Sequence, residues 1–292
     1  MSLSSRFHTS WQLLQSSVHV LRRNRRLLLF PLISLACALV MIAFFLAPML
    51  YLGIGSSGSE EMFRTLGDRM NAVSVAYGAI IYLTAMFVGT FFNVAFYHQI
   101  LGAFAGEPVS VRAGLGFARS RIGAIAMWSL LAGTIGWVIR AIEERLGWIG
   151  KIIMGLVGIA WSVAAVFAIP VIIRREDSNP LAVLRDSAAT LKKTWGESLV
   201  GFLGIRMTGV ILAGVMIVFI LFETVAMFVF EPFWPLVVLN VVWFLVFFAA
   251  MFVVHIATDV YRCALYVYAT EGVVPEPYTP ELMDAAWKVK KS

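Results

Sequence analysis

Long stretches without a charged side chain constrain this chain more than any other feature. Residues 232–258, for example, contain no Asp, Glu, Lys or Arg. An α-helix of about 20 mostly apolar residues is long enough to cross the hydrocarbon core of a bilayer. Charged residues make up only 14% of the chain, whereas soluble domains contain about 25%. Because so little of the surface suits water, the sequence predicts a polytopic membrane protein.

Six segments are long and apolar enough to be membrane spans. They are residues 27–52, 73–105, 122–139, 152–173, 199–222 and 233–269. In lipid, only helices and closed barrels satisfy their own backbone polar groups. Uncharged runs of this length without an alternating pattern exclude a barrel. The predicted fold is therefore an all-α integral membrane protein with six transmembrane helices, in a single membrane domain of residues 1–292.

The distribution of Lys and Arg predicts the topology. Six spans place both termini on one side of the membrane, and that side holds most of the basic residues. The opposite side holds only Arg64, Arg69, Arg140, Arg145 and Lys151. Basic residues in short loops stay in the cytoplasm. Both termini are therefore expected in the cytoplasm, and the predicted location is the inner membrane of a bacterium.

Three cytoplasmic segments have the apolar stripe of an amphipathic helix, over residues 7–21, 111–122 and 181–195. Apolar residues recur in them at spacings of three and four, and each segment leads directly into a span. A helix with Trp or Phe on one face and Lys or Arg on the other lies in the membrane interface. Basic residues near two of these helices are expected to face anionic headgroups: Arg22, Arg23, Arg25, Arg26, Lys192 and Lys193.

The order of interfacial helix, span, span occurs three times. The corresponding repeats would be residues 1–105, 106–177 and 178–292. The ends of the even-numbered spans read AFYHQILGAFAGEPVSVR, VFAIPVIIRREDSNPLAV and VYRCALYVYATEGVVPEP. Each passes from aromatic and aliphatic residues through an acidic residue to a proline, after which a helix can restart. Duplication explains this pattern, although similar constraints in each part could also produce it.

Parts of the chain resemble known families. FHTSWQLLQSSVHVLRRNRRLLLFPLIS near the start, LAVLRDSAATLKKTWGE in the middle and ALYVYATEGVVPE near the end resemble a bacterial family of six-span membrane proteins of unknown function. More distantly, the chain is similar to the group that includes the glycerophosphodiester phosphodiesterase membrane domain. The resemblance covers most of the chain but includes no catalytic motif. It supports the fold more than any activity. The soluble phosphodiesterase domain found beside some relatives is not seen in this sequence, so that activity cannot be carried over.

Motifs for catalysis and cofactor binding are not found. GIGSSG at residues 53–58 matches GxGxxG, but this fingerprint requires a βαβ unit and here follows a membrane span. The sequence contains no P-loop, HExxH, CxxC or GxSxG. Cys37 and Cys263 offer no metal-ligand spacing. The sequence favours a protein without enzymatic activity, cofactor, metal or nucleic-acid partner.

Polar residues inside the predicted spans are the candidate site. Arg206 and Asp259 are each about eight to ten residues from the cytoplasmic end of consecutive spans, and unpaired charges in lipid are costly. We therefore predict that they pair. His255, Asp259 and Arg262 share one helix face, and His98 could join them from the second span. The cluster could be a hydrated binding site or a buried latch between helices, and both interpretations remain open.

Two functions follow from these features. The first is a non-enzymatic membrane protein that engages anionic lipid, a membrane-protein partner or a second copy of itself, in support of envelope organisation or assembly. The second is a transporter or channel for a small solute or lipid, with the polar cluster as its site. Water access to Asp259 distinguishes them.

Overall fold

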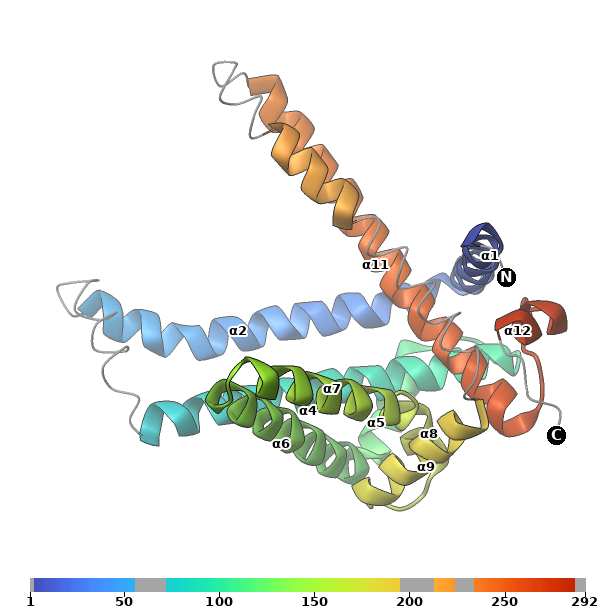
Figure 1. Cartoon of the computed structure of the whole chain (residues 1–292), viewed down its shortest axis with the longest axis horizontal. Helices are drawn as coiled ribbons and strands as arrows, with labels where there is room; N and C mark the ends of the chain where they lie inside the picture. The colour runs from blue at the N-terminus through green and yellow to red at the C-terminus, as the bar shows by residue number, and fades with distance from the viewer. Residues whose placement is uncertain (1–2, 56–71, 195–212, 224–233, 287–292) are drawn as a thin grey trace. The chain divides into compact units, whose positions relative to one another are not determined.

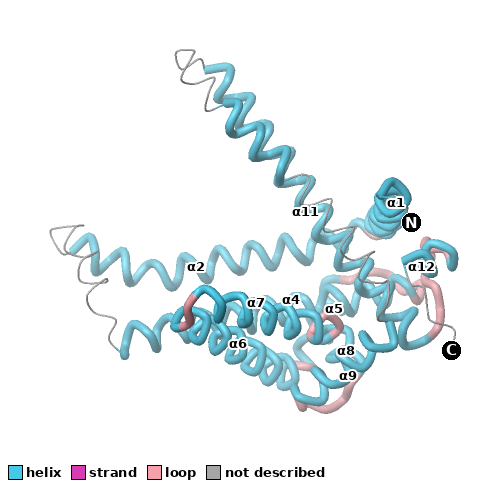
Figure 2. Tube along the Cα trace, viewed as in Figure 1, coloured by secondary structure: helices cyan, strands magenta, loops and turns pink. Residues whose placement is uncertain are grey.

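The computed structural model of the chain describes residues 3–55, 72–194, 213–223 and 234–286. Within these ranges the chain is helical apart from short turns and contains no strand (Figure 2). The predicted all-α fold is thus confirmed for the described residues. They belong to two compact units, residues 1–25, 103–107 and 190–292 in the first and residues 26–102 and 108–189 in the second.

Five described helical segments are long and apolar enough to cross a membrane. They are Arg25–Ala47, Val75–Phe104, Ile122–Arg145, Gly150–Arg174 and Val238–Glu271, and they match five of the six predicted spans. The other predicted span, residues 199–222, lies largely outside the described residues, and its last part belongs to the apolar helix Ala213–Glu223. These helices indicate a multi-pass membrane protein.

Long helices of the second unit pack in successive pairs. They are α2 (Leu29–Gly55), α4 (Ala72–Phe104), α6 (Ile122–Arg145) and α7 (Trp148–Ala164) (Figure 1). The Tyr77 hydroxyl of α4 donates to the carbonyl oxygen of Phe45 in α2 at 2.7 Å. The Ser129 hydroxyl of α6 donates to the carbonyl oxygen of Met86 in α4 at 3.4 Å. Trp128 of α6 stacks on Trp161 of α7, with 6.2 Å between ring centroids.

Apolar side chains cover the outside of these helices. Leu39 and Phe44 of α2 are exposed, as are Ile152, Leu156 and Ile159 of α7. Large exposed apolar surfaces are unusual in a soluble monomer and mark a membrane or protein interface. Because these helices are also long enough to span, their exposed faces are suited to lipid.

Short helices follow three of the spans, and each begins with a polar cap. They are α5 (Val111–Ser120), α9 (Pro180–Thr194) and α12 (Pro280–Ala286). The side chains of Ser110, Asn179 and Thr279 accept hydrogen bonds from backbone N–H groups in the first turn of these helices. Such caps satisfy donors that a helix start otherwise leaves unpaired. In α9, Asn179 is the cap and Pro180 is the first residue of the helix.

Two spans end in a glycine with a left-handed backbone. Gly106 follows α4 and Gly272 follows α11 (Trp234–Glu271), with φ of 81° and 69°. Side chains rarely adopt this conformation, whereas glycine adopts it readily and commonly terminates helices. The N–H of Gly272 donates to the carbonyl of Tyr268 at 3.0 Å, which closes the last turn of α11.

In the first unit, α1 (Leu3–Arg23) packs against α11 and α12. The buried residues of α1 are Leu13, Leu14, Ser17, Val20 and Leu21. The hydroxyls of Ser17 and Tyr278, which precedes α12, are hydrogen-bonded at 2.8 Å. Ala213–Glu223 contacts the first part of α11, where the Phe219 and Trp243 rings lie 4.6 Å apart.

The apolar stripes predicted for the amphipathic helices are divided between protein and surface. In α1, Leu14 and Leu21 are buried in the protein, but Trp11 is 45% exposed. In α9, Leu191 is buried, whereas Leu181 is 62% exposed. Each helix therefore docks one side of its stripe on the protein and leaves an apolar edge outside.

Candidate functional site

Three residues of the predicted polar cluster lie on α11. Nη1 of Arg262 lies 3.3 Å from the Asp259 carboxylate, and Nε2 of His255 lies 3.8 Å from it. The Asp259 side chain is only 8% exposed, whereas that of His255 is 75% exposed. One face of α11 thus brings a buried carboxylate between a cation and an imidazole. Arg206 lies outside the described residues, so the Arg206–Asp259 pair stays a prediction.

His98 lies on α4, in the second unit, and contacts α5. Its ring stacks on that of Phe117, with 3.9 Å between centroids. Nε2 of Gln99 lies within hydrogen-bond distance of Nδ1 of His98, at 3.2 Å. Oε1 of Gln99 accepts from the backbone N–H of Ser110 at 2.7 Å. These contacts hold the start of α5 on α4. A joint cluster of His98 with the α11 residues stays a prediction.

The basic residues between α1 and α2 are exposed. Arg22 and Arg23 form the last turn of α1, where cations are favoured by the helix dipole. Arg25 and Arg26 open the 3₁₀-helix η1 (Arg25–Leu28), and all four arginines are exposed. Nη1 of Arg26 also donates to the carbonyl of Val109 at 3.5 Å, a weak bond that leaves most of its donors available.

Lys192 is exposed near the end of α9. It is followed by Lys193 in the last turns of the same helix. The basic end of α9 therefore resembles the basic end of α1 in its place on the helix.

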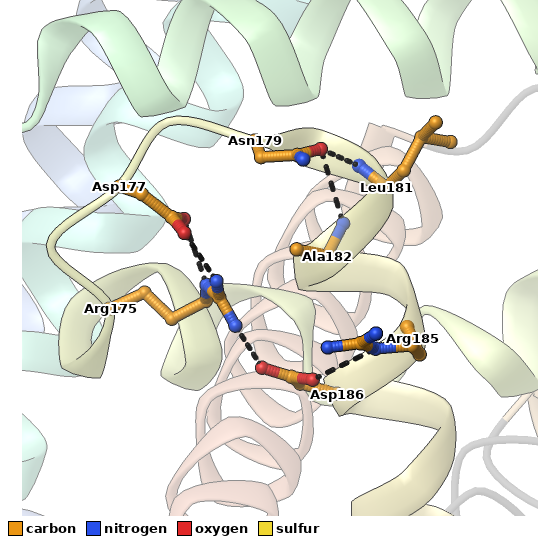
Figure 3. A network of polar contacts seen from close by, with 7 residues as sticks. All are labelled: Arg175, Asp177, Asn179, Leu181, Ala182, Arg185 and Asp186. Carbon is orange, nitrogen blue, oxygen red and sulfur yellow. Dashed lines mark hydrogen bonds and ion pairs between the residues drawn. The ribbon is translucent and has the colours of Figure 1, made fainter.

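A charged network joins α9 to the end of α8 (Ala168–Arg174) (Figure 3). Nε of Arg175 donates to Oδ1 of Asp177 at 2.9 Å, and a second nitrogen contacts Oδ2 of the same carboxylate. The remaining terminal nitrogen of Arg175 pairs with Asp186 of α9. The hydrogen bonds from Arg175 lower the pKa of Asp177 and, in return, raise the pKa of Arg175.

Three functional or structural residues were missed by the sequence analysis. Ser17 and Ser187 are fully buried on the inner faces of α1 and α9. Each serine lies four positions after a buried aliphatic residue. A small polar residue within an apolar stripe is a signal that could have been noticed in the sequence. Glu223 is 8% exposed, and its Oε1 has no hydrogen-bond partner among the residues that the structure describes. Its position directly after a predicted span made it look like an ordinary boundary residue.

Comparison with known proteins identifies a family. A sequence model described as a family of unknown function, DUF6159, matches residues 72–275. The chain belongs to this family. The DUF6159 match runs from α4 to α11 and so covers most of the described spans. No curated protein and no solved structure matches the chain. The expected family of unknown function is thereby confirmed, while similarity to the glycerophosphodiester phosphodiesterase group gains no support.

Proposed function

We propose that this DUF6159 protein is a non-enzymatic multi-pass protein of the bacterial inner membrane that binds anionic lipid headgroups through the basic ends of α1 and α9. Both termini lie in the cytoplasm in this proposal, so the basic ends meet the inner leaflet. Binding of lipid there, or of a membrane protein carrying an acidic surface, would support envelope organisation or assembly.

The exposed arginines at the end of α1 and in the adjoining η1 are the observation on which the proposal rests. Arg22, Arg23, Arg25 and Arg26 are exposed, and Leu29 and Leu32 just beyond them in α2 are exposed as well. The cations therefore stand where an apolar, lipid-suited surface begins. Anionic headgroups attract each nearby Lys or Arg by about 1 kcal/mol.

The likeness of α1 and α9 supports a shared role. Counted from Ser17 and Ser187, four buried positions coincide in the two helices, and two basic residues follow at the same distance. The corresponding buried sets are Leu13, Ser17, Val20 and Leu21 in α1 and Val183, Ser187, Thr190 and Leu191 in α9. This agreement, with the polar caps of α5, α9 and α12, also supports the proposed threefold repeat.

Lipid retention by the full chain tests the proposal. Native mass spectrometry would compare wild type, Arg22→Gln/Arg23→Gln and the control Arg140→Gln/Arg145→Gln after equilibration with mixed anionic and zwitterionic lipid. Loss of two attractions of about 1 kcal/mol each should weaken anionic-lipid binding roughly thirtyfold in the first variant. The control removes the same charge from the opposite predicted side and should retain its lipid. Equal loss in both variants, or no preference for anionic lipid in wild type, would refute the proposal.

A transporter or channel is the second candidate, and His255 is the observation that favours it. An imidazole that is 75% exposed within a candidate span, next to a buried Asp259, suits a water-lined path better than contact with lipid. The variant His255→Cys, in a background with Cys37→Ala and Cys263→Ala, would be treated with a membrane-impermeant thiol reagent. Rapid labelling from the cytoplasmic side supports the transporter, and complete protection excludes a hydrated path at this residue.

A further inference from the structure

The fourth candidate span is interrupted within its length. It comprises α7, which ends at Ala164, and α8, which begins at Ala168. Between them the N–H of Val166 donates to Val163 and that of Ala168 to Ala165, so the hydrogen bonds span three residues rather than four. Pro170, which has no N–H to donate, follows in the first turn of α8. The helix is therefore broken just before this proline.

A serine from α9 bridges the two sides of this break. The Ser187 hydroxyl donates to the carbonyl of Ala164 at 2.6 Å and accepts from the N–H of Phe167 at 3.0 Å. Ser187 is fully buried and Phe167 is 2% exposed. A single side chain thus binds the last residue of α7 and the residue preceding α8. In lipid, broken spans depend on such side chains to satisfy their backbone groups.

A second contact ties α9 to the far end of α8. Asp186 is adjacent to Ser187 and pairs with Arg175, directly after α8 (Figure 3). The two short helices are therefore held together at both ends of α8. The residues of α8 are largely buried, in contrast to the exposed outer face of α7. Any change in the angle between α7 and α8 must alter the contacts of Ser187.

We propose that the break between α7 and α8 is a hinge and that anionic lipid bound at the basic end of α9 sets its position. The inference rests on the proposed lipid-binding function and adds a regulatory step to it. Lys192 is five residues from Ser187 on one continuous helix, about 7.5 Å along its axis. Lipid that holds α9 in its docked position therefore keeps the Ser187 bridge closed. Coupling of this kind is reciprocal, so a closed bridge also favours lipid binding.

Amide exchange of the full chain in nanodiscs of defined lipid composition tests the hinge. Wild type should exchange several-fold more slowly at residues 165–168 in anionic than in zwitterionic lipid. Ser187→Ala should exchange fast in both lipids. Lys192→Gln/Lys193→Gln should exchange at the same rate in both lipids, and this rate should not exceed that of wild type in zwitterionic lipid. The exposed Ser120→Ala is the matched control and should behave as wild type.

Lipid retention, measured on the same samples, separates the two proposals. If anionic lipid is retained at α9 but exchange at the break is the same in both lipids, the hinge coupling is wrong. If no anionic lipid is retained at all, the proposed function fails first. Should Ser187→Ala not fold, Asp186→Asn removes the neighbouring pair with Arg175 and leaves the hydroxyl in place. This variant should also raise exchange at the break, and an unchanged rate would contradict the role of α9.

Discussion

Two glycines of α5 allow the packing of this helix on α4 to be tested directly. A Cβ added to Gly114 would lie 2.9 Å from the carbonyl oxygen of Ala95 in α4 and 2.8 Å from the ring of Phe30. A Cβ added to Gly116 would meet nothing within 4 Å. Both glycines are in the same ten-residue helix. Gly114→Ala should therefore destabilise α5, and Gly116→Ala should stabilise it.

The magnitude follows from two opposing effects. Replacing Gly by Ala in a helix interior gains about 1 kcal/mol at either position. Ordinary carbon–oxygen contacts are about 3.3 Å or longer, so the new methyl at position 114 must displace a backbone carbonyl by several tenths of an ångström. Overpacking of this kind costs about 1–3 kcal/mol. Because the helix propensity gain is common to both variants, their difference isolates the overpacking cost of about 1–3 kcal/mol.

Hydrogen exchange of α5 amides in the full-length protein measures this difference as an opening free energy. We expect faster exchange across α5 in Gly114→Ala and slower exchange in Gly116→Ala, with α6 amides as an internal reference. The Gln99 bond to the Ser110 N–H should be weakened in the first variant only. If the two variants differ by less than about 0.5 kcal/mol, α5 does not pack closely on α4 and the described contact is wrong.

Three further substitutions test other contacts. Ser17→Ala should cost about 1–3 kcal/mol, measured by unfolding in mixed micelles, because it leaves the buried Tyr278 hydroxyl without its 2.8 Å partner; Tyr278→Phe together with Ser17→Ala should recover part of that loss. Trp128→Ala should cost about 3–5 kcal/mol by the same assay, since Trp128 is buried against α7, whereas the exposed Trp148→Ala should cost far less. Asp177→Asn should speed amide exchange at the α8–α9 turn at neutral pH but not below the folded-state pKa of Asp177. Arg175 lowers the pKa of Asp177 in the folded protein. The stabilisation from the Asp177–Arg175 pair is therefore fully present above the unfolded pKa of about 3.9 and disappears as pH falls through the folded value.

The helical type of the fold and the positions of five spans could be predicted because lipid imposes simple rules. A span needs length and apolar side chains. The sequence shows both in residues 27–52 and 122–139 without knowledge of packing. The start of α9 can also be predicted from the sequence, since Asn179 and Pro180 are local signals that act on the backbone of the same helix. Predictions succeeded where the cause lies within a few residues of its effect.

The site could be predicted only in part, because its contacts depend on which helices meet. His255, Asp259 and Arg262 lie close together on one helix, as residues spaced four and three apart do, but whether they form a binding site stays a prediction. The ring of His98 stacks on Phe117 of another helix, and no sequence pattern near His98 predicts that partner. Ser187 likewise gains its importance from a break twenty residues away. The break itself had a signal in Pro170, whereas the position of Ser187 in an apolar stripe does not reveal which residues it contacts.

A buried serine on the inner face of α1 and one on the inner face of α9 each make polar contacts with another part of the chain. Apolar burial gives spans little drive to associate in lipid, so hydrogen bonds and close packing must fix their register. Ser187 of α9 bonds to the α7–α8 break, and Ser17 of α1 bonds to Tyr278, which precedes α12. Their partners are entirely different residues, so the two bridges should act independently. The unfolding cost of Ser17→Ala/Ser187→Ala should therefore equal the sum of the single variants within about 0.5 kcal/mol. A cost that departs from the sum by more than 1 kcal/mol would show that the two helices unfold as one cooperative element.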